Sequence, residues 1–145
     1  MAEVRYTELT KSTVTLQFMD DINRLIARLS PGAPPCTAQW LGKMFDSGTR
    51  MFVAIAGENI VGTVLLVPMV ILVGQKDWVE DVVVDEAYAR RGIASKLMDM
   101  AEQASRERGA TSVNLTSKPH RGAARDMYVN RGYHLRDTGV FRLTF

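Results

Sequence analysis

A short basic loop at residues 89–95, with the sequence Ala-Arg-Arg-Gly-Ile-Ala-Ser, follows a run of β-branched residues and opens an amphipathic helix. The first N–H groups of a helix lack acceptors within the helix, and the helix dipole places positive potential beside them. A glycine-containing loop at such a position binds anions, and phosphate suits it best. Arg90 and Arg91 add positive charge at the same point. The loop therefore predicts a site for a phosphorylated cofactor.

Two neighbouring carboxylates, Glu80 and Asp81, lie on the strand that we expect over residues 78–84. Side chains alternate across a strand, so we expect these two to face opposite sides of the sheet, and only one to face a given pocket directly. A carboxylate near a desolvated site can accept a proton or hold a cation. The alternative is a solvated or salt-bridged residue near the start of a strand.

Other reactive side chains are few. The chain has one cysteine, Cys36, and two histidines, His120 and His134. No group of His, Cys, Asp and Glu has the spacing of metal ligands, so we expect no metal site. We expect Cys36 to be a non-catalytic thiol and the histidines to be surface or capping residues.

The hydrophobic pattern predicts the elements that position these residues. Pro68 should bend or bulge the longest strand, and the loop at residues 30–35 is rich in proline. The order predicts an α/β (α+β) fold, a mixed central sheet of six to seven strands with helices on both faces. The expected strands cover residues 4–9, 51–56, 60–73, 78–84, 113–116, a stretch from Gly132, and 140–145; the expected helices cover residues 14–29, 121–130, a stretch from Thr37, and a stretch from Ile93 to a stop at Arg108 and Gly109.

Bulk properties limit the class of protein. The chain has 145 residues, of which 46% are hydrophobic and 23% are charged. This length and composition predict a single domain over residues 1–145. The net charge of +2 and the lack of a basic stripe argue against a nucleic-acid partner. The first residues lack the apolar region of a signal peptide, so we expect none, and the apolar run at 60–73 is too short to span a membrane. The single cysteine is typical of a reducing compartment, so we expect a cytoplasmic protein with no membrane partner.

The element order and two motifs resemble the GNAT family, the Gcn5-related N-acetyltransferases. The family motif Gln/Arg-x-x-Gly-x-Gly/Ala falls on residues 89–94, with Ala89 where the family usually has Gln or Arg. Residues 124–133, with the sequence Ala-Arg-Asp-Met-Tyr-Val-Asn-Arg-Gly-Tyr, resemble the family block Ala-x-x-Leu-Tyr-x-x-x-Gly-Phe. Residues 79–84 are also similar to the corresponding strand of glucosamine-6-phosphate N-acetyltransferases. The resemblance implies a GNAT fold over nearly the whole chain.

The resemblance also implies the cofactor acetyl-CoA. Its pyrophosphate would lie on the backbone amides of residues 91–95, and its pantetheine arm would lie beside the strand that ends at residue 84. A backbone N–H near Val82 would polarise the thioester carbonyl. Arg121 matches a position that often contacts the cofactor, with a solvated arginine as the alternative. The expected cofactor-binding residues are Val82, Val83, Val84, Ala89, Arg90, Arg91, Gly92, Ile93, Ala94, Ser95 and Arg121.

The implied reaction is acetyl transfer to a primary amine, by direct attack of the amine. Tyr128 matches the family tyrosine near the cofactor sulfur, where a phenol would protonate the departing thiolate. Glu80 is the candidate base, acting through a water, or an anchor for the amine. Asp81 and Trp78 are the candidate substrate-binding residues.

Several acceptors remain open at this point: an aminosugar or aminoglycoside, a polyamine or amino-acid amine, and a protein lysine or N-terminus. A compact chain favours a small molecule. The alternative in another class is a non-catalytic acyl-CoA-binding module. In the family the region between the first two helices borders the acceptor pocket, so the loop at 30–35 should form a stiff rim. Family members are often dimers, and residues 140–145 are a candidate pairing edge for a homodimer.

Overall fold

The computed structural model describes residues 3–145, and these form two compact units that divide between Leu115 and Thr116. Each unit is described by itself below. Met1 and Ala2, which belong to the segment in which we expect no signal peptide, lie outside the described residues. A single domain over the whole chain stays a prediction.

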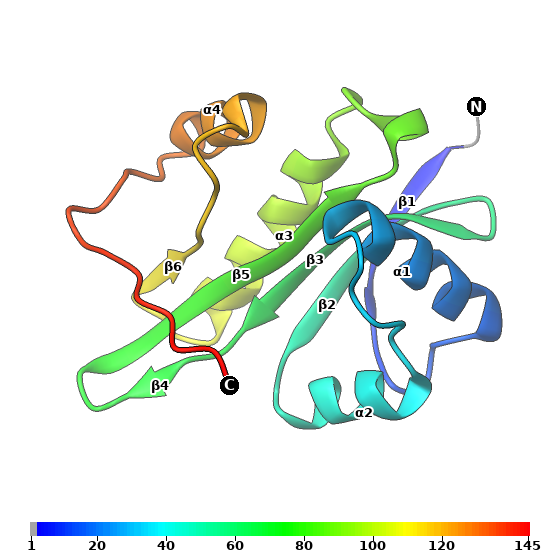
Figure 1. Ribbon diagram of the computed structural model, residues 1–145, viewed down its shortest axis with the longest axis horizontal. Coiled ribbons are helices and arrows are strands. Elements are labelled where there is room, and N and C mark those ends of the chain that lie inside the picture. Colours follow the sequence, from blue (N-terminus) through cyan, green and yellow to red (C-terminus); the bar gives the residue numbers. More distant parts are fainter. Residues whose placement is uncertain (1–2) are drawn as a thin grey trace. The chain divides into compact units, whose positions relative to one another are not determined.

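The first unit is built on a six-stranded mixed sheet (Figure 1). Four strands run in the order β1-β2-β3-β5 with antiparallel neighbours, β4 pairs with the start of β5, and β6 joins β5 in parallel. The mixed sheet expected from the sequence is therefore confirmed. The strands are β1 (Val4–Leu9), β2 (Arg50–Ala56), β3 (Asn59–Val67), β4 (Val70–Ile71), β5 (Gly74–Val84) and β6 (Ser112–Asn114).

Three α-helices accompany the sheet: α1 (Leu16–Leu29), α2 (Ala38–Asp46) and α3 (Ile93–Glu107). A 3₁₀ turn, η1 (Glu86–Tyr88), follows β5. Thr15 and Thr37 cap α1 and α2, each accepting a hydrogen bond from a backbone N–H three residues on. Side chains of α1 and α2 pack against alternate residues of β2 (Met51, Val53 and Ile55), whereas α3 lies on the other face of the sheet (Figure 1).

Close packing on the α3 face depends on one glycine of β3. A Cβ atom at Gly62 would lie 3.1 Å from Ile93 and 3.3 Å from Leu97, both on α3. The sheet and the helix can therefore approach here only because residue 62 has no side chain. Strand β2 is buried on both faces, which explains its uninterrupted apolar sequence.

A β-bulge interrupts β5 at Asp81. The pairing of β5 with β3 shifts between Thr63 and Leu65, and Asp81 has a left-handed φ of 50°. Glu80 pairs with Leu65, and Val83 pairs with Thr63, so the segment of β5 between these pairs holds one extra residue. Paired residues share a face of the sheet, which fixes the side on which each β5 residue lies.

The second unit holds one helix, α4 (Gly122–Asn130), close to the expected 121–130. The two strands expected from Gly132 and over 140–145 are wrong, since residues 131–145 contain no strand. Their alternation of apolar residues suits a half-buried strand, but Phe141, Leu143 and Phe145 are exposed. Alternation alone does not make a strand without a hydrogen-bonding partner and a covered face.

Other element boundaries were also mispredicted. The expected strand over 60–73 is two strands, because β3 ends at Val67 before Pro68, which has no N–H to donate to a sheet. Strand β5 begins at Gly74, four residues before the expected start at Trp78, since it pairs with β4 in a hairpin. No helix in the described part of the chain is long and apolar enough to cross a membrane.

Candidate active site

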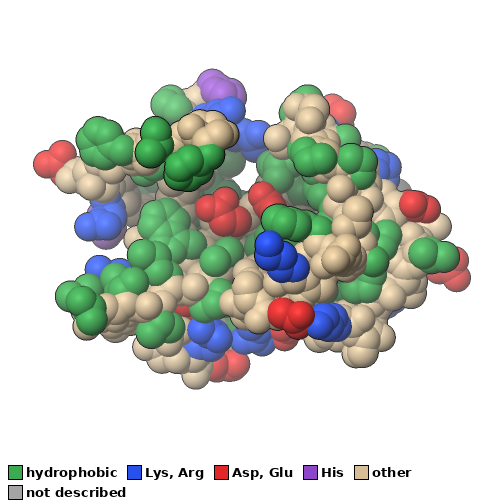
Figure 2. Space-filling model, turned by 60° about the horizontal axis from the view of Figure 1, so that its bottom comes forward, with side chains coloured by type: hydrophobic (Ala, Val, Ile, Leu, Met, Phe, Trp, Pro, Cys, Tyr) green, Lys and Arg blue, Asp and Glu red, His purple; other side chains and the backbone are tan. Residues whose placement is uncertain are grey.

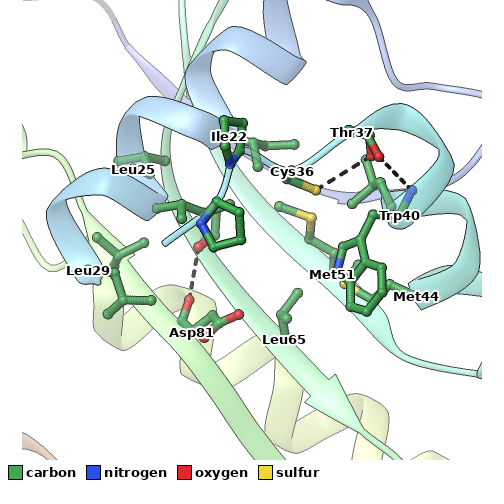
Figure 3. Close-up of a pocket in the computed structure, with 16 residues that line it drawn as sticks. Ile22, Leu25, Leu29, Cys36, Thr37, Trp40, Met44, Met51, Leu65 and Asp81 are labelled. Carbon is green, nitrogen blue, oxygen red and sulfur yellow. Dashed lines mark hydrogen bonds between the residues drawn. The ribbon is translucent and has the colours of Figure 1, made fainter. Parts of the chain in front are cut away.

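A cavity of about 380 Å³ lies in the first unit between α1, α2 and the sheet (Figure 3). Helices α1 and α2 and the loop between them form its walls, and strands β2, β3 and β5 form its floor. The expected rim loop does border it, through Pro34 and Pro35. The lining residues are Ile22, Leu25, Ile26, Leu29, Pro34, Pro35, Cys36, Thr37, Trp40, Leu41, Met44, Met51, Thr63, Leu65, Asp81 and Val83.

Asp81 is the one charged residue among those that line the cavity. The bulge places it there, and the Thr63 hydroxyl donates a hydrogen bond of 3.0 Å to its backbone carbonyl (Figure 3). Burial raises the pKa of the Asp81 carboxyl above its ordinary value. A carboxylate beside an apolar cavity favours a cationic partner, because the partner's charge compensates for the lost water.

Glu80 lies on the same face of the sheet as Asp81. It pairs with Leu65, which lines the cavity, although Glu80 itself does not line it. The expectation that the two carboxylates face opposite sides is therefore wrong, because the bulge at Asp81 breaks the alternation. Burial raises the pKa of Glu80, and the nearby charge of Asp81 raises it further. Figure 2 shows acidic and hydrophobic side chains together on the face in view.

The loop that follows β5 has the backbone shape of an anion site. Gly92 forms the N-cap of α3 with a left-handed φ of 75°, and Arg90 is also left-handed with a φ of 60°. No side chain caps α3, and its first turn contains no acidic residue. The Arg91 guanidinium lies over the Tyr88 ring, 5.1 Å from its centre. The N-terminus of a 15-residue helix beside two arginines can bind an anion such as phosphate.

Helix α1 is tied to this loop by charged contacts. Arg24 forms an ion pair with Asp85, and it donates a hydrogen bond of 3.1 Å to the backbone carbonyl of Ile60. Arg28 forms a second ion pair, at 3.2 Å, with Glu86. The wall of the cavity and the loop that leads to α3 are thus held by the same helix.

Tyr128 and Arg121 belong to the second unit. The ring of Tyr128 meets that of Tyr133 edge to face, with the ring centres 5.9 Å apart. Burial raises the pKa of the Tyr128 phenol, and the positive charge of Arg121 acts in the opposite direction. A raised pKa keeps the phenol protonated at neutral pH, so it can donate a proton.

The structure brings some of the expected residues together and separates others. Glu80, Asp81 and Val83 share one face of β5, whereas Val84 pairs with Gly62, whose face is covered by α3. Trp78 does not line the cavity, and its indole N–H points to the sulfur of Met69 at 2.9 Å. Residues 89–95 form the loop and first turn of α3, as expected.

Sequence reasoning missed most of the cavity wall. Trp40 lies on an apolar stripe of α2, yet it lines the cavity and 59% of its surface is exposed. Cys36 also lines the cavity, and burial raises the pKa of its thiol, which argues against a reactive thiolate. An apolar stripe predicts a buried helix face equally well whether that face meets a core or a pocket.

Comparisons with known proteins agree with this fold. The acetyltransferase (GNAT) family model matches residues 17–133. A search of curated protein sequences found no match. Among solved structures, an acetyltransferase of Trypanosoma brucei has a TM-score of 0.81 at 23% identity, covering 99% of this chain and 100% of that one.

Two further solved structures are of enzymes whose names state the amine that they acetylate. An aminoglycoside acetyltransferase from an uncultured soil metagenomic sample, in complex with sisomicin, has a TM-score of 0.85 at 20% identity, covering 98% of this chain and 96% of that one. Glucosamine-6-phosphate N-acetyltransferase from Arabidopsis thaliana has a TM-score of 0.76 at 15% identity, covering 97% and 98%. At these identities the structures show the shared fold. With the match over residues 17–133, the chain belongs to the GNAT family of N-acetyltransferases.

Proposed function

We propose that this chain transfers the acetyl group of acetyl-CoA to a primary amine of a small molecule. The main support for this function is the pair of carboxylates, Glu80 and Asp81, on the cavity face of β5. The same strand leads directly into the anion-binding loop before α3. Acetylation of an amine needs both features, a group that handles the ammonium proton and a site for the phosphates of the cofactor.

Acetyl-CoA supplies the acetyl group and a thiolate leaving group. We assign its pyrophosphate to the backbone amides of residues 91–95, with Arg90 and Arg121 as further cationic contacts. Because Ala89 cannot donate a side-chain hydrogen bond, the backbone and the arginines would supply the binding. The backbone of Val82 and Val84 would hold the pantetheine arm, and the N–H at Val82 would polarise the thioester carbonyl.

The two carboxylates take different tasks in this proposal. Asp81 lines the cavity and would hold the substrate ammonium. Glu80 would accept a proton from that ammonium through a water, which leaves the nitrogen lone pair free to attack. Its raised pKa makes it a stronger base than an ordinary carboxylate. The new carbon–nitrogen bond forms as the carbon–sulfur bond breaks.

Tyr128 would donate its phenolic proton to the departing sulfur, and its phenolate would take up, through water, the surplus proton that the acylated nitrogen loses as the amide forms. Its raised pKa supports this role, because the proton is present at neutral pH. Proton transfer of this kind contributes roughly 10²- to 10⁴-fold to a rate. A homodimer and a cytoplasmic location stay predictions from the sequence.

The experiment that tests the proposal measures release of the coenzyme A thiol from acetyl-CoA over a panel of primary amines. Tyr128→Phe should lower kcat at least tenfold and leave the Kd for acetyl-CoA within twofold, because only the hydroxyl is removed. Tyr133→Phe is the matched control, since it removes a hydroxyl from the neighbouring ring and should retain turnover. Binding of acetyl-CoA without thiol release from any amine would instead favour the non-catalytic acyl-CoA-binding module.

A further inference from the structure

The cavity wall is mostly apolar, and it contains one charged group. Aliphatic residues of α1, among them Leu25 and Leu29, face Trp40 and Met44 of α2 across the cavity (Figure 3). The charged group, Asp81, lies on the floor of the cavity. This arrangement offers one binding site for a cationic group. The rest of the wall favours apolar groups of a ligand, because burying their surface is what stabilises binding there.

The hydroxyl and thiol groups of the lining each make a hydrogen bond within the protein. The Thr37 hydroxyl accepts a hydrogen bond of 3.1 Å from the Trp40 backbone N–H, which caps α2. The Thr63 hydroxyl donates to the backbone of Asp81, and the Cys36 thiol points to the Thr37 carbonyl at 3.6 Å. A ligand with many hydroxyl groups would lose water here and find few partners, which makes its binding unfavourable.

The cavity is also small. Its volume of about 380 Å³ lies near the lower end of the usual range for ligand pockets, about 300–1,000 Å³. An aminoglycoside, with several rings and several ammonium groups, would place additional charges against aliphatic side chains. A polyamine would do the same with its second and third ammonium groups.

We propose that the acceptor is a primary amine on a compact apolar body, of the arylalkylamine or alkylamine class. The ammonium group would bind the Asp81 carboxylate, and the apolar body would pack between α1 and α2 against Trp40 and Met44. This inference rests on the proposed acetyl transfer, and it narrows the small-molecule amine of that proposal to one chemical class.

The test compares amines at matched concentrations in the thiol-release assay with the full chain. The apolar set is 2-phenylethylamine, tryptamine and hexylamine, and the polar set is glucosamine, sisomicin and spermidine. The apolar amines should have kcat/KM values at least tenfold above those of the polar set. If kcat/KM were equal for the two sets, or higher for the polar set, the proposed acceptor class would be wrong. The proposed acetyl transfer would still be supported, because thiol would be released. No thiol release with any amine would overturn both.

A variant links the preference to the cavity. Trp40→Ala should raise KM for 2-phenylethylamine at least fivefold and leave KM for acetyl-CoA unchanged. Because Trp40 is exposed over 59% of its surface, its removal should leave the fold intact, which thermal unfolding would check. Leu16→Ala is the matched control, since Leu16 is exposed on α1 and does not line the cavity. An unchanged KM in Trp40→Ala would place the apolar body elsewhere and overturn the proposed binding mode.

Discussion

At the scale of single residues, the site depends on one residue that departs from the regular strand. Asp81 occupies the bulge of β5 with a left-handed φ, a conformation that aspartate and asparagine tolerate better than most residues. The bulge puts two carboxylates on one face, and the charge of Asp81 affects the titration of Glu80. The pKa of Glu80 is raised first by burial and then by the charge of Asp81.

The first prediction concerns the pH dependence of turnover. With Glu80 as the base, the rate should fall as pH falls through its pKa, and this acidic limb should lie above pH 4.5, the ordinary value for glutamate. Glu80→Gln should lower kcat roughly 10²- to 10⁴-fold and remove the limb, because the amide accepts no proton. Steady-state rates from pH 4.5 to 9 measure both effects.

Asp81→Asn is the informative comparison for that experiment. It removes the charge that raises the pKa of Glu80, so the acidic limb should move to lower pH while the KM for the amine rises. A pH profile that is the same in the wild type and in Glu80→Gln would exclude Glu80 from proton transfer and leave it an anchor at most.

The second prediction concerns stability. Since the pKa of Asp81 is raised on folding, the folded state binds its proton more tightly than the unfolded state. The free energy of unfolding therefore decreases as pH rises from the ordinary aspartate value, 3.8, through the raised value. Asparagine has no negative charge to bury and tolerates the left-handed conformation. The variant Asp81→Asn should therefore have a higher Tm than the wild type at pH 7. Its advantage should shrink as pH is lowered toward 4.

Thermal unfolding between pH 4 and 8 checks this prediction, with Asp137→Asn as an exposed control that should change Tm little. A lower Tm for Asp81→Asn at pH 7 would mean that the carboxylate stabilises the fold. Its raised pKa would then need another explanation.

At the scale of elements, the sequence predicted the interior better than the edges. The position of the loop before α3 could be predicted because a glycine between a β-branched run and an amphipathic stripe marks the start of a helix. The strand β2 was predicted from its uninterrupted apolar sequence, and the helices α1 and α3 from an apolar periodicity that reflects their burial in the structure. By contrast, the bulge at Asp81 depends on pairing with β3, which no local pattern encodes.

The cavity could not be predicted for a related reason. A core helix and a pocket wall contain the same residue types. The residue types of Trp40 and Met44 therefore do not indicate that these side chains line a cavity. The proline-rich loop was the one useful signal, because it restricts how α1 and α2 can close on each other. The chain's last residues, 140–145, show the opposite error, since alternation there predicted a strand that lacks a partner in its unit.

The third prediction concerns the proposed binding of phosphate groups at the N-terminus of α3. Gly92→Asp should weaken acetyl-CoA binding at least tenfold, because it puts a negative charge where the pyrophosphate binds. A Cβ atom at this position meets nothing within 4 Å, and both Asp and Asn favour helix N-caps and tolerate a positive φ. Gly92→Asn therefore has nearly the same shape without the charge, and it should bind within threefold of the wild type.

Isothermal titration calorimetry with acetyl-CoA separates these cases. Equal weakening in both variants would point to the backbone conformation of Gly92 rather than to charge. Unchanged binding in both would place the phosphates away from this loop.

At the scale of the whole molecule, the parts of the proposed site come from distant parts of the chain. The carboxylates and the anion loop belong to the first unit, and Tyr128 belongs to the second. A ligand that binds only the folded chain stabilises every part on which its binding depends. Ligand-dependent unfolding is therefore a test of whether the chain acts as one cooperative enzyme.

The fourth prediction follows from this linkage. Acetyl-CoA at 100 times its Kd should raise the free energy of unfolding by about 2.7 kcal/mol, which corresponds to an increase in Tm of about 5–11 °C for a chain of this size. Differential scanning fluorimetry with and without acetyl-CoA measures the shift. Adenosine, which lacks the pyrophosphate, should give no comparable shift, and Gly92→Asp should lose most of it while Gly92→Asn keeps it. If saturating acetyl-CoA left Tm unchanged in the wild type, the loop before α3 would not be a working cofactor site, and the proposed acetyl transfer would fail with it.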